Sequence, residues 1–234
     1  MRNLNYGGNR YYSYPHKMPE VQRHGFIWQD ELIHNVYRAT DSEIQSITYT
    51  SKMDLPSEMN HLDGKDLSIK VSCSANSVCM ADALRIYDAV SDTPHHMTVI
   101  VYSQNSANTK KIMTITEVDL SNSVNALFGD ITRAELEELD KAVKAVPQKR
   151  SPTAAERTAM YSIRDKLQLR CGAIHLDIKC NSQQSRLQCS FNRFVKFLED
   201  YPLRIVAQSK CGEFRGGHIT EEIASGRRTF AAKL

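Results

Sequence analysis

The sequence predicts a mixed α/β (α+β) fold with a central mixed β-sheet flanked by helices. Apolar residues recur at helical spacing in several segments, and segments of alternating β-rich residues lie between them. The length of 234 residues and the hydrophobic content of 41% suit one elaborated domain with a sizeable core. We therefore expect a single domain over residues 1–234.

The first half of the chain predicts a core over residues 26–121, preceded by an arm over residues 1–25. The arm is rich in Gly, Asn, Tyr and Arg and has no periodicity. Pro56 and the Asp63–Gly64 pair favour a turn or hairpin connection within the core. The expected core elements are a helix over 26–39, strands over 46–52 and 66–74, a helix over 77–90, and strands over 96–104 and 110–120.

The second half predicts a helical region over residues 122–170 and a basic region over residues 171–234. Thr132 and Glu135 have the spacing of a capping box, which marks a helix start. The expected elements are helices over 132–146 and 151–170, a hairpin of strands over 173–180 and 185–191, a short helix over 192–201 and a strand over 203–209.

The net charge of +3 is unevenly distributed along the chain. Residues 147–234 contain 16 Lys and Arg against 8 Asp and Glu, a net charge of +8, whereas residues 1–146 carry a net charge of −5. A basic second half favours a polyanionic ligand such as nucleic acid. An ordinary solvated basic surface explains the same counts, so the charge is one indication among several.

Several classes of protein are excluded by missing patterns. The sequence contains no run of about 18 apolar residues, so no membrane-spanning helix is expected. The first 20 residues lack the apolar segment of a secretory signal, so we expect a cytoplasmic protein without membrane contact. The sequence has no Walker A loop, GxSxG, HExxH or GxGxxG motif. Nucleotide hydrolysis, the serine-hydrolase pattern and zinc proteases are therefore not expected, nor is a nucleotide cofactor.

Five polar residues of the predicted core carry the candidate chemistry. They are Glu31, Asp54, Ser68, Lys70 and Asp82. Hydrolysis of a phosphodiester needs a divalent cation on the phosphate, an activated water and relief of charge at the leaving oxygen. Carboxylates hold Mg²⁺ because it prefers hard oxygen ligands. A neighbouring lysine can orient or deprotonate the attacking water and stabilise the charge of the transition state.

The stretch "MDLP" at 53–56, followed by "SIK" at 68–70, resembles the active-site pattern of the PD-(D/E)XK nuclease superfamily, most of all its type II restriction endonucleases. That family has an aspartate at a strand or turn and a (D/E)-x-K tripeptide on the next strand. A glutamate on an earlier helix is frequent, and Glu31 would supply it. The resemblance covers about residues 26–104 and implies a restriction-endonuclease-like core with Asp54 and Lys70 as Mg²⁺-dependent catalytic residues.

The sequence departs from that pattern at two points. Leu55 and Pro56 follow the aspartate, whereas the family has a proline before it. Ser68 stands where the family has an acidic residue. Some restriction enzymes have the sequence S-x-K at this point and take the missing carboxylate from the following helix. The resemblance gives this role to Asp82.

Other assignments remain open. Asp63 and Asp66 compete for the metal role; Asp63 precedes Gly64 and suits a turn, whereas Asp66 can share the face of Ser68. We therefore expect metal ligation by Asp54 with Asp66 or Asp82, and the sequence leaves Glu31 open as a further candidate for the second ligand. The plainer interpretation makes Asp54 a turn residue and Lys70 an edge charge. A rival centre is the D-x-K of Asp177 and Lys179, with Asp165 upstream in a predicted helix.

The predicted hairpin near the C-terminus suits contact with DNA. A two-stranded ribbon can enter the major groove, where Asn and Gln bridge adenine and Arg bridges guanine. The candidate DNA-binding residues are Lys179, Asn181, Gln183, Gln184, Arg186, Gln188 and Arg193. Arg215, Arg227 and Arg228 of the tail are further candidates for phosphate contacts. A polar surface hairpin without a ligand is the alternative.

Together these observations predict a Mg²⁺-dependent endonuclease of the type II restriction class that cuts a short sequence of double-stranded DNA. A palindromic target makes a homodimer natural, with helices between residues 131 and 169 as the contact. One alternative is a repair or recombination nuclease that selects DNA by its structure. Another is a non-catalytic DNA-binding protein, which would bind without cutting.

Overall fold

The structure is a computed structural model that describes residues 20–47, 53–147 and 149–225. The expected fold class is confirmed, because a central mixed sheet lies between helices. The helical segments are α1 (Glu20–Glu31), η1 (Leu32–Val36), α2 (Asp41–Ser46), η2 (Ser57–Met59), α3 (Ala83–Asp92), α4 (Val124–Phe128), α5 (Arg133–Lys144), α6 (Ala154–Gln168), α7 (Phe194–Asp200) and η3 (Pro202–Arg204).

The main sheet has five strands and mixed polarity. β1 (Asp66–Ser72) pairs in parallel with β3 (His95–Gln104), and β3 pairs antiparallel with β4 (Thr109–Asp119). The other edge of β4 is shared by β7 (Ile205–Ser209) and β10 (Glu222–Ala224), which are both antiparallel to it. The parallel pair requires a crossover, and α3 lies in the connection between β1 and β3.

A second, antiparallel sheet has the order β2-β6-β5. It consists of β2 (Val78–Asp82), β6 (Gln184–Phe191) and β5 (Ile174–Asn181), so the expected hairpin near the C-terminus is present as β5–β6. A small hairpin of β8 (Glu213–Phe214) and β9 (Gly217–His218) follows β7.

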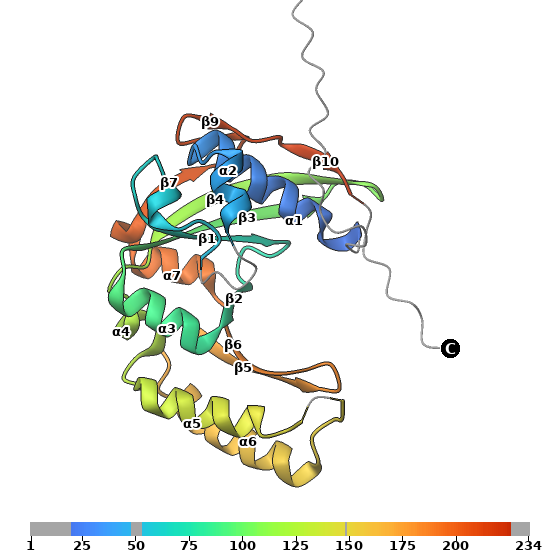
Figure 1. The fold of residues 1–234 in the computed structure, drawn as a ribbon, viewed down its shortest axis with the longest axis vertical. Helices are drawn as coiled ribbons and strands as arrows, with labels where there is room; N and C mark the ends of the chain where they lie inside the picture. The colour runs from blue at the N-terminus through green and yellow to red at the C-terminus, as the bar shows by residue number, and fades with distance from the viewer. Residues whose placement is uncertain (1–19, 48–52, 148, 226–234) are drawn as a thin grey trace, which may run out of the picture.

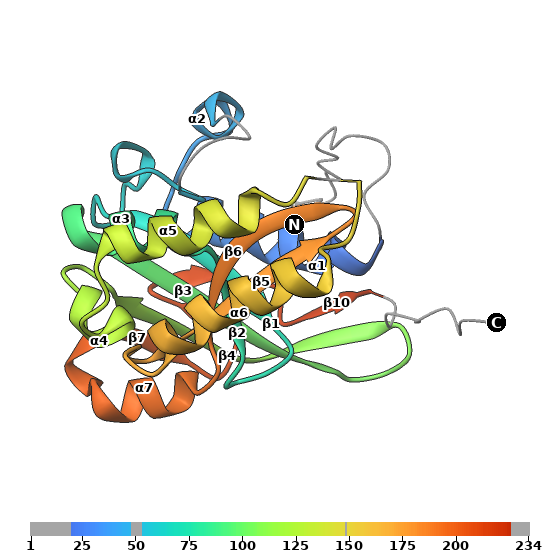
Figure 2. The same cartoon turned by 90° about the horizontal axis from the view of Figure 1, so that it is seen from below.

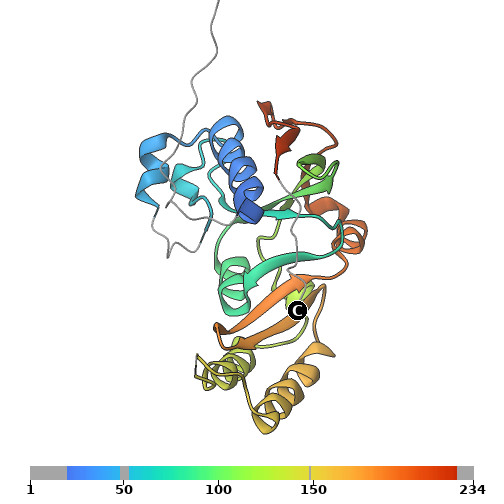
Figure 3. The ribbon, with the colours of Figure 1, turned by 90° about the vertical axis from the view of Figure 1, so that its right-hand side faces the viewer.

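The elements lie in layers (Figure 1). α1 and α2 lie on one side of the main sheet, and α3 and the second sheet lie on the other. The helices α5 and α6 run side by side over the far face of β5 and β6 (Figure 2). Seen from its side, the chain forms two parts, one around each sheet (Figure 3). We call the two sides of the main sheet the α1 face and the α3 face.

Each face of the main sheet has its own hydrophobic core. The core on the α1 face includes Trp28, Leu32 and Ile100, all fully buried. The larger core on the α3 face joins Val99 of β3 to Leu187 of β6 and to the apolar sides of α5 and α6. Because side chains alternate along a strand, neighbouring residues of β1 and β3 point into different cores.

Two predicted element assignments are wrong in the described residues. Residues 20–25 belong to α1 and not to an arm, and residues 1–19 of the predicted arm lie outside the described residues. Ser46 is the last residue of α2, and residues 48–52 of the expected strand over 46–52 also lie outside the described residues. Residues 78–82 form β2, and the expected helix over 77–90 begins only at Ala83. Pairing with β6, more than 100 residues away, overrides the local helical pattern in that segment.

The capping box predicted for α5 is confirmed. Thr132 accepts the backbone N–H of Glu135, and the Glu135 side chain accepts the backbone N–H of Thr132. Thr153 and Glu156 make the same arrangement at the start of α6. Across the described stretches of the chain, none of the helices combines the length and apolar character needed to cross a membrane.

Candidate functional site

Asp54 and Lys70 form an ion pair at the outer edge of β1. The Oδ2 atom of Asp54 lies 3.0 Å from Nζ of Lys70 and also accepts the backbone N–H of Ile69 at 2.7 Å. Both side chains are partly exposed, 28% for Asp54 and 19% for Lys70. The structure therefore brings together the two residues on which the nuclease prediction rests, at a place that a ligand can reach.

A short antiparallel bridge positions Asp54. Leu55 is fully buried in the core of the α1 face, and its backbone exchanges hydrogen bonds of 2.8 and 3.1 Å with Leu67 of β1. This bridge covers the edge of β1 at Leu67, where backbone groups would otherwise be unpaired. Asp54 precedes Leu55 and is thereby held beside Ile69 and Lys70 of β1.

Ser68 lies on the same face of β1 as Lys70, as strand alternation requires. Its register partner on β3 is Met97, which belongs to the core of the α3 face. Ser68 is only 4% exposed. Ser68 is thus two residues from Lys70 and on the same face of β1, but a ligand has little access to it.

Asp66 begins β1 and lines a pocket that Met53, the residue before Asp54, also lines. Its Oδ1 atom accepts the backbone N–H of Ser57 at 2.8 Å, which fixes the chain that approaches β1. The pocket has a volume of about 310 Å³ and lies between that chain and α3. It is lined by Met53, Pro56, Asp66, Arg85, Asp88, Ala89, Asp92 and Thr93.

Glu31 and Asp82 are used elsewhere. The carboxylate of Glu31 accepts the backbone N–H and the hydroxyl of Thr220, both at 2.7 Å, and so ties α1 to the C-terminal segment. Asp82 is the N-cap of α3 and accepts the backbone N–H of Arg85 at 3.0 Å. Each carboxylate has a structural partner, and no hydrogen bond or ion pair within the described part of the chain joins either one to Asp54 or Lys70.

His95 is a buried neighbour of this site. It opens β3 in register with Asp66 and is fully buried, and neither ring nitrogen has a hydrogen-bond partner among the residues that the structure describes. Burial lowers its pKa to about 4; the charges acting on it, in decreasing order, are those of Asp66, Lys70, His96 and Asp54. The imidazole is therefore neutral at pH 7, and burying it without a partner opposes folding.

Replacing His95 with Leu is expected to make folding less sensitive to acid. The pKa of His95 is about 4 in the folded chain and 6.5 when exposed, so the unfolded chain binds the proton first as the pH falls. The contribution of this histidine to the free energy of unfolding is thus fully present above pH 6.5 and is lost as the pH falls from 6.5 to 4. At pH 5 the loss is about 2 kcal/mol. Urea unfolding at pH 7 and pH 5 measures this loss. It should shrink in His95→Leu and persist in His218→Leu, a substitution at an exposed histidine.

The β5–β6 hairpin presents polar residues on one face. Lys179 lies opposite Arg186 and Asn181 opposite Gln184. The helices α5 and α6 cover the other face, so this polar face is on the side that holds the main sheet (Figure 1). Lys179, Asn181, Gln183 and Arg186 are exposed, and Gln184 is half-buried. Five of the candidate DNA-binding residues therefore gather at this end of the hairpin.

The other two candidates lie apart from this end. Gln188 is buried, at 6% exposure, and in the amide orientation that satisfies both groups it accepts from the Arg186 guanidinium at 3.3 Å. Gln188 is thus placed to orient Arg186 rather than to reach a base. Arg193 precedes α7 and lines a separate pocket of about 530 Å³, together with His175 and Lys196.

The rival centre is dispersed. Asp177 accepts the hydroxyl of Ser190 at 2.7 Å, whereas Lys179 points to solvent near the hairpin turn. Asp165 lies on α6 and pairs with its neighbour Arg164 at 2.7 Å. The D-x-K sequence at this site therefore does not assemble the carboxylate–lysine contact seen at Asp54 and Lys70.

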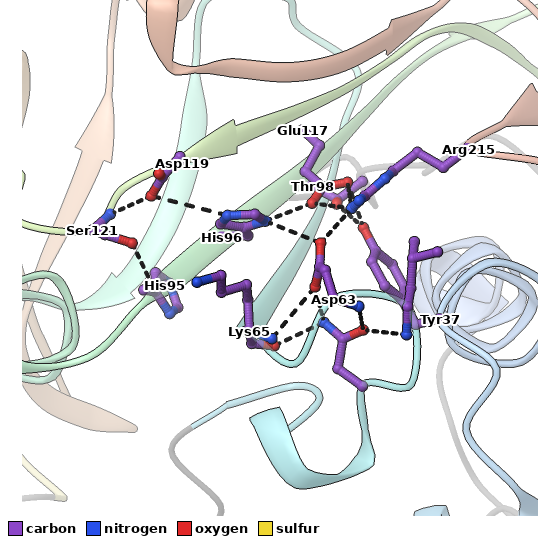
Figure 4. Close-up of polar contacts among 12 residues, drawn as sticks. Tyr37, Asp63, Lys65, His95, His96, Thr98, Glu117, Asp119, Ser121 and Arg215 are labelled. Atoms are coloured by element: carbon purple, nitrogen blue, oxygen red, sulfur yellow. Dashed lines mark hydrogen bonds and ion pairs between the residues drawn. The ribbon is translucent and has the colours of Figure 1, made fainter.

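A second polar group lies on the α1 face, around the fully buried carboxylate of Glu117 (Figure 4). The hydroxyl of Tyr37 donates to Oε2 at 3.0 Å, and Nδ1 of His96 lies 2.7 Å from Oε1. The Nη1 atom of Arg215 donates to both oxygens, at 2.7 and 2.9 Å, and to Oδ2 of Asp63 at 2.8 Å. We call Asp63, His96, Glu117 and Arg215 the Glu117 cluster.

Strand alternation and one turn build the Glu117 cluster. His96 on β3 and Glu117 on β4 both face α1, and Arg215 reaches them from the turn between β8 and β9. Burial, and then the charge of Glu117, raise the pKa of Tyr37 well above its ordinary value, so the phenol stays a hydrogen-bond donor. Arg215 is used inside the protein, and the expected phosphate contact at this arginine is not supported; Arg227 and Arg228 lie outside the described residues.

The sequence did not indicate this cluster. Its members lie at four distant places in the chain, and Asp63 resembled an ordinary Asp-Gly turn residue. The only local sign is an acidic residue inside a strand, Glu117, which strand burial makes unfavourable unless it is paired. In the structure, ligand atoms of Asp63, His96 and Glu117 lie within 4.8 Å of one another, so these three residues can hold a metal ion.

No protein-family model matches the sequence, and neither the curated proteins nor the solved structures include a significant match to this chain.

Proposed function

We propose that this protein is a Mg²⁺-dependent endonuclease that hydrolyses phosphodiester bonds of duplex DNA at the Asp54–Lys70 pair. The observation that carries the proposal is the 3.0 Å contact between the Asp54 carboxylate and the Lys70 ammonium at an accessible strand edge. An isolated turn aspartate and an unrelated edge lysine need not meet. Their contact favours the catalytic interpretation of the MDLP and SIK stretches over the plainer one.

The donor set around the pair suits a hard cation. The hydrogen bonds of the described residues use Oδ2 of Asp54 and Oδ1 of Asp66 and leave one oxygen of each carboxylate free. Mg²⁺ is commonly held by one or two carboxylates and keeps several waters. Asp54 and Asp66 would hold it, and when bound it would supply charge neutralisation at the scissile phosphate.

Lys70 has two tasks in this proposal. Its ammonium is held by Asp54, which keeps the long side chain in one orientation at the strand edge. From there it donates a hydrogen bond to the attacking water or to a phosphate oxygen, where negative charge accumulates in the transition state. Ser68 is too deeply buried for a direct part in this chemistry and supports the strand instead.

The polar face of the β5–β6 hairpin is proposed to read the DNA sequence. Lys179 and Arg186 supply positive charge side by side, and Asn181 and Gln184 supply amides at the tip. The side-chain oxygen of Asn181 accepts the backbone N–H groups of Gln183 and Gln184, which orders the turn before any ligand binds. Such preorganisation reduces the entropy lost on binding.

Replacing Arg186 with Ala is expected to weaken binding to the cleaved sequence by about 1–3 kcal/mol and to weaken binding to unrelated DNA less, because arginine reads guanine through two hydrogen bonds. Fluorescence anisotropy with the mapped site and with a scrambled duplex, at one salt concentration, gives both affinities. Lys210→Ala, at an exposed lysine after β7, serves as the control. An equal loss for both duplexes would make Arg186 a phosphate contact only.

The proposal is tested by incubating the purified chain with plasmid and long phage DNA, with Mg²⁺ and with EDTA. Discrete Mg²⁺-dependent bands on a gel support a sequence-specific endonuclease, and a homodimer, with α5 and α6 as its contact, is then expected from a palindromic site. A smear supports the structure-selective nuclease. Intact DNA with unmethylated and methylated substrates, in Mg²⁺ and in Mn²⁺, together with salt-sensitive binding, supports the non-catalytic protein and rejects the nuclease.

A further inference from the structure

The Glu117 cluster is built to hold positive charge inside the protein. Asp63 and Glu117 contribute two negative charges, and Arg215, the cation that contacts them both, contributes one positive charge. The cluster therefore sets two carboxylates against one guanidinium, although Glu117 is fully buried and His96 is only 8% exposed. A divalent cation in the place of Arg215 would balance the charges of the two carboxylates.

The donor atoms of the cluster suit a transition metal. Oxygens of Asp63 and Glu117 and a ring nitrogen of His96 lie within 4.8 Å of one another, so a single ion can reach all three. His96 Nδ1 lies 2.7 Å from Glu117 and 3.7 Å from Asp63. Carboxylates suit hard cations and imidazole suits first-row transition metals, so the mixed set favours Mn²⁺ or Fe²⁺ over Mg²⁺.

Arg215 occupies the turn of the β8–β9 hairpin, with φ of 48° at Arg215 and 80° at Gly216. The hairpin is anchored by the buried Phe214 and by Gly217, where a Cβ would lie 2.5 Å from the backbone oxygen of Asn35. Arg215 itself is 18% exposed and Asp63 19%, so an ion can approach from solvent on this side.

From these observations we propose that Asp63, His96 and Glu117 form a binding site for a divalent transition-metal ion, for which the Arg215 guanidinium stands in when the ion is not bound. The ion and the guanidinium compete for the same carboxylate oxygens. The site lies on the α1 face of the main sheet, whereas Ser68 and Lys70 lie on the α3 face, so this proposal does not depend on the nuclease function.

Mn²⁺ binding to the full chain and to Arg215→Met tests the proposal. Mn²⁺ is the suitable probe because it is detected by electron paramagnetic resonance and has little affinity for the exposed thiols of Cys73, Cys79 and Cys211. After removal of metals with EDTA, Arg215→Met is expected to bind Mn²⁺ at least tenfold more tightly than the unsubstituted chain, since its competitor is gone. The bound ion should show coupling to an imidazole nitrogen.

Two further variants make the result decisive. His96→Gln should weaken the binding of the nitrogen-coupled ion at least tenfold and remove the coupling. Asp54→Asn, which removes a ligand of the proposed nuclease site, should leave the nitrogen-coupled signal and its Mn²⁺ affinity unchanged, which separates the two sites. Equal Mn²⁺ affinity in Arg215→Met and the unsubstituted chain overturns the proposal. If Arg215→Met does not fold, the comparison of the unsubstituted chain with His96→Gln decides: equal affinity without nitrogen coupling overturns it as well.

Discussion

Replacing Arg215 with Met, in the presence of EDTA, is expected to lower the free energy of unfolding by about 3–5 kcal/mol, the usual effect of removing one partner of a buried ion pair. Glu117 is fully buried and receives two hydrogen bonds from the Arg215 guanidinium. Without the guanidinium its charge remains buried and uncompensated. Met preserves most of the volume of the arginine stem, so the change reports on charge more than on packing.

Urea unfolding followed by circular dichroism measures this effect. Arg170→Met is the matched control, because Arg170 also pairs with two carboxylates, those of Asp130 and Glu135, but on the exposed surface. Solvent screens that pair, so a far smaller change is expected. Equal losses for the two variants would show that burial of the Glu117 cluster contributes nothing special to stability.

Replacing Lys70 with Met is expected to reduce DNA cleavage by a factor of about 10²–10⁴ while DNA affinity changes by no more than a few-fold. The loss follows from removing the ammonium that would stabilise the transition state. The affinity is retained because one charge at the strand edge is a small part of a duplex contact. Single-turnover cleavage of the mapped site measures the rate, and anisotropy in Ca²⁺ measures binding.

The control for Lys70→Met is Lys210→Met, which removes an equal charge from an exposed position after β7 and should leave both quantities unchanged. Asp54→Asn should lower cleavage like Lys70→Met, because the two side chains act as a pair. Cleavage that survives in both variants would move the chemistry away from this edge of β1. A loss of DNA binding in parallel with cleavage would instead assign Lys70 to substrate binding.

The main sheet carries two ion pairs that differ in burial, one on the α1 face and one at the edge of β1. On the α1 face, Glu117 and Arg215 bind each other inside the fold. At the edge of β1, Asp54 and Lys70 remain accessible, and His95 lies buried behind them without a partner among the described residues. A buried polar group without a partner opposes folding, and the functional site proposed at this edge of β1 would account for its presence there.

Local patterns in the sequence were sufficient for the elements whose contacts are local. Thr132 and Glu135 predicted the start of α5, since a capping box is formed by residues three apart. The β5–β6 hairpin followed from alternation on both sides of a short polar turn. Asp54 and Lys70 were paired through the resemblance of their stretches to the nuclease pattern, and in the structure the two segments meet at one backbone bridge.

Only the tertiary structure decided the features that depend on distant segments. The segment at 78–82 has a helical pattern, yet pairing with β6 makes it a strand. Glu117, His96 and Arg215 meet because β3, β4 and a C-terminal turn converge, and no spacing along the chain encodes that meeting. Burial also depends on distant segments. Burial changes the free energy of charging a histidine or glutamate because it removes water from the side chain, and it depends on how the whole fold packs.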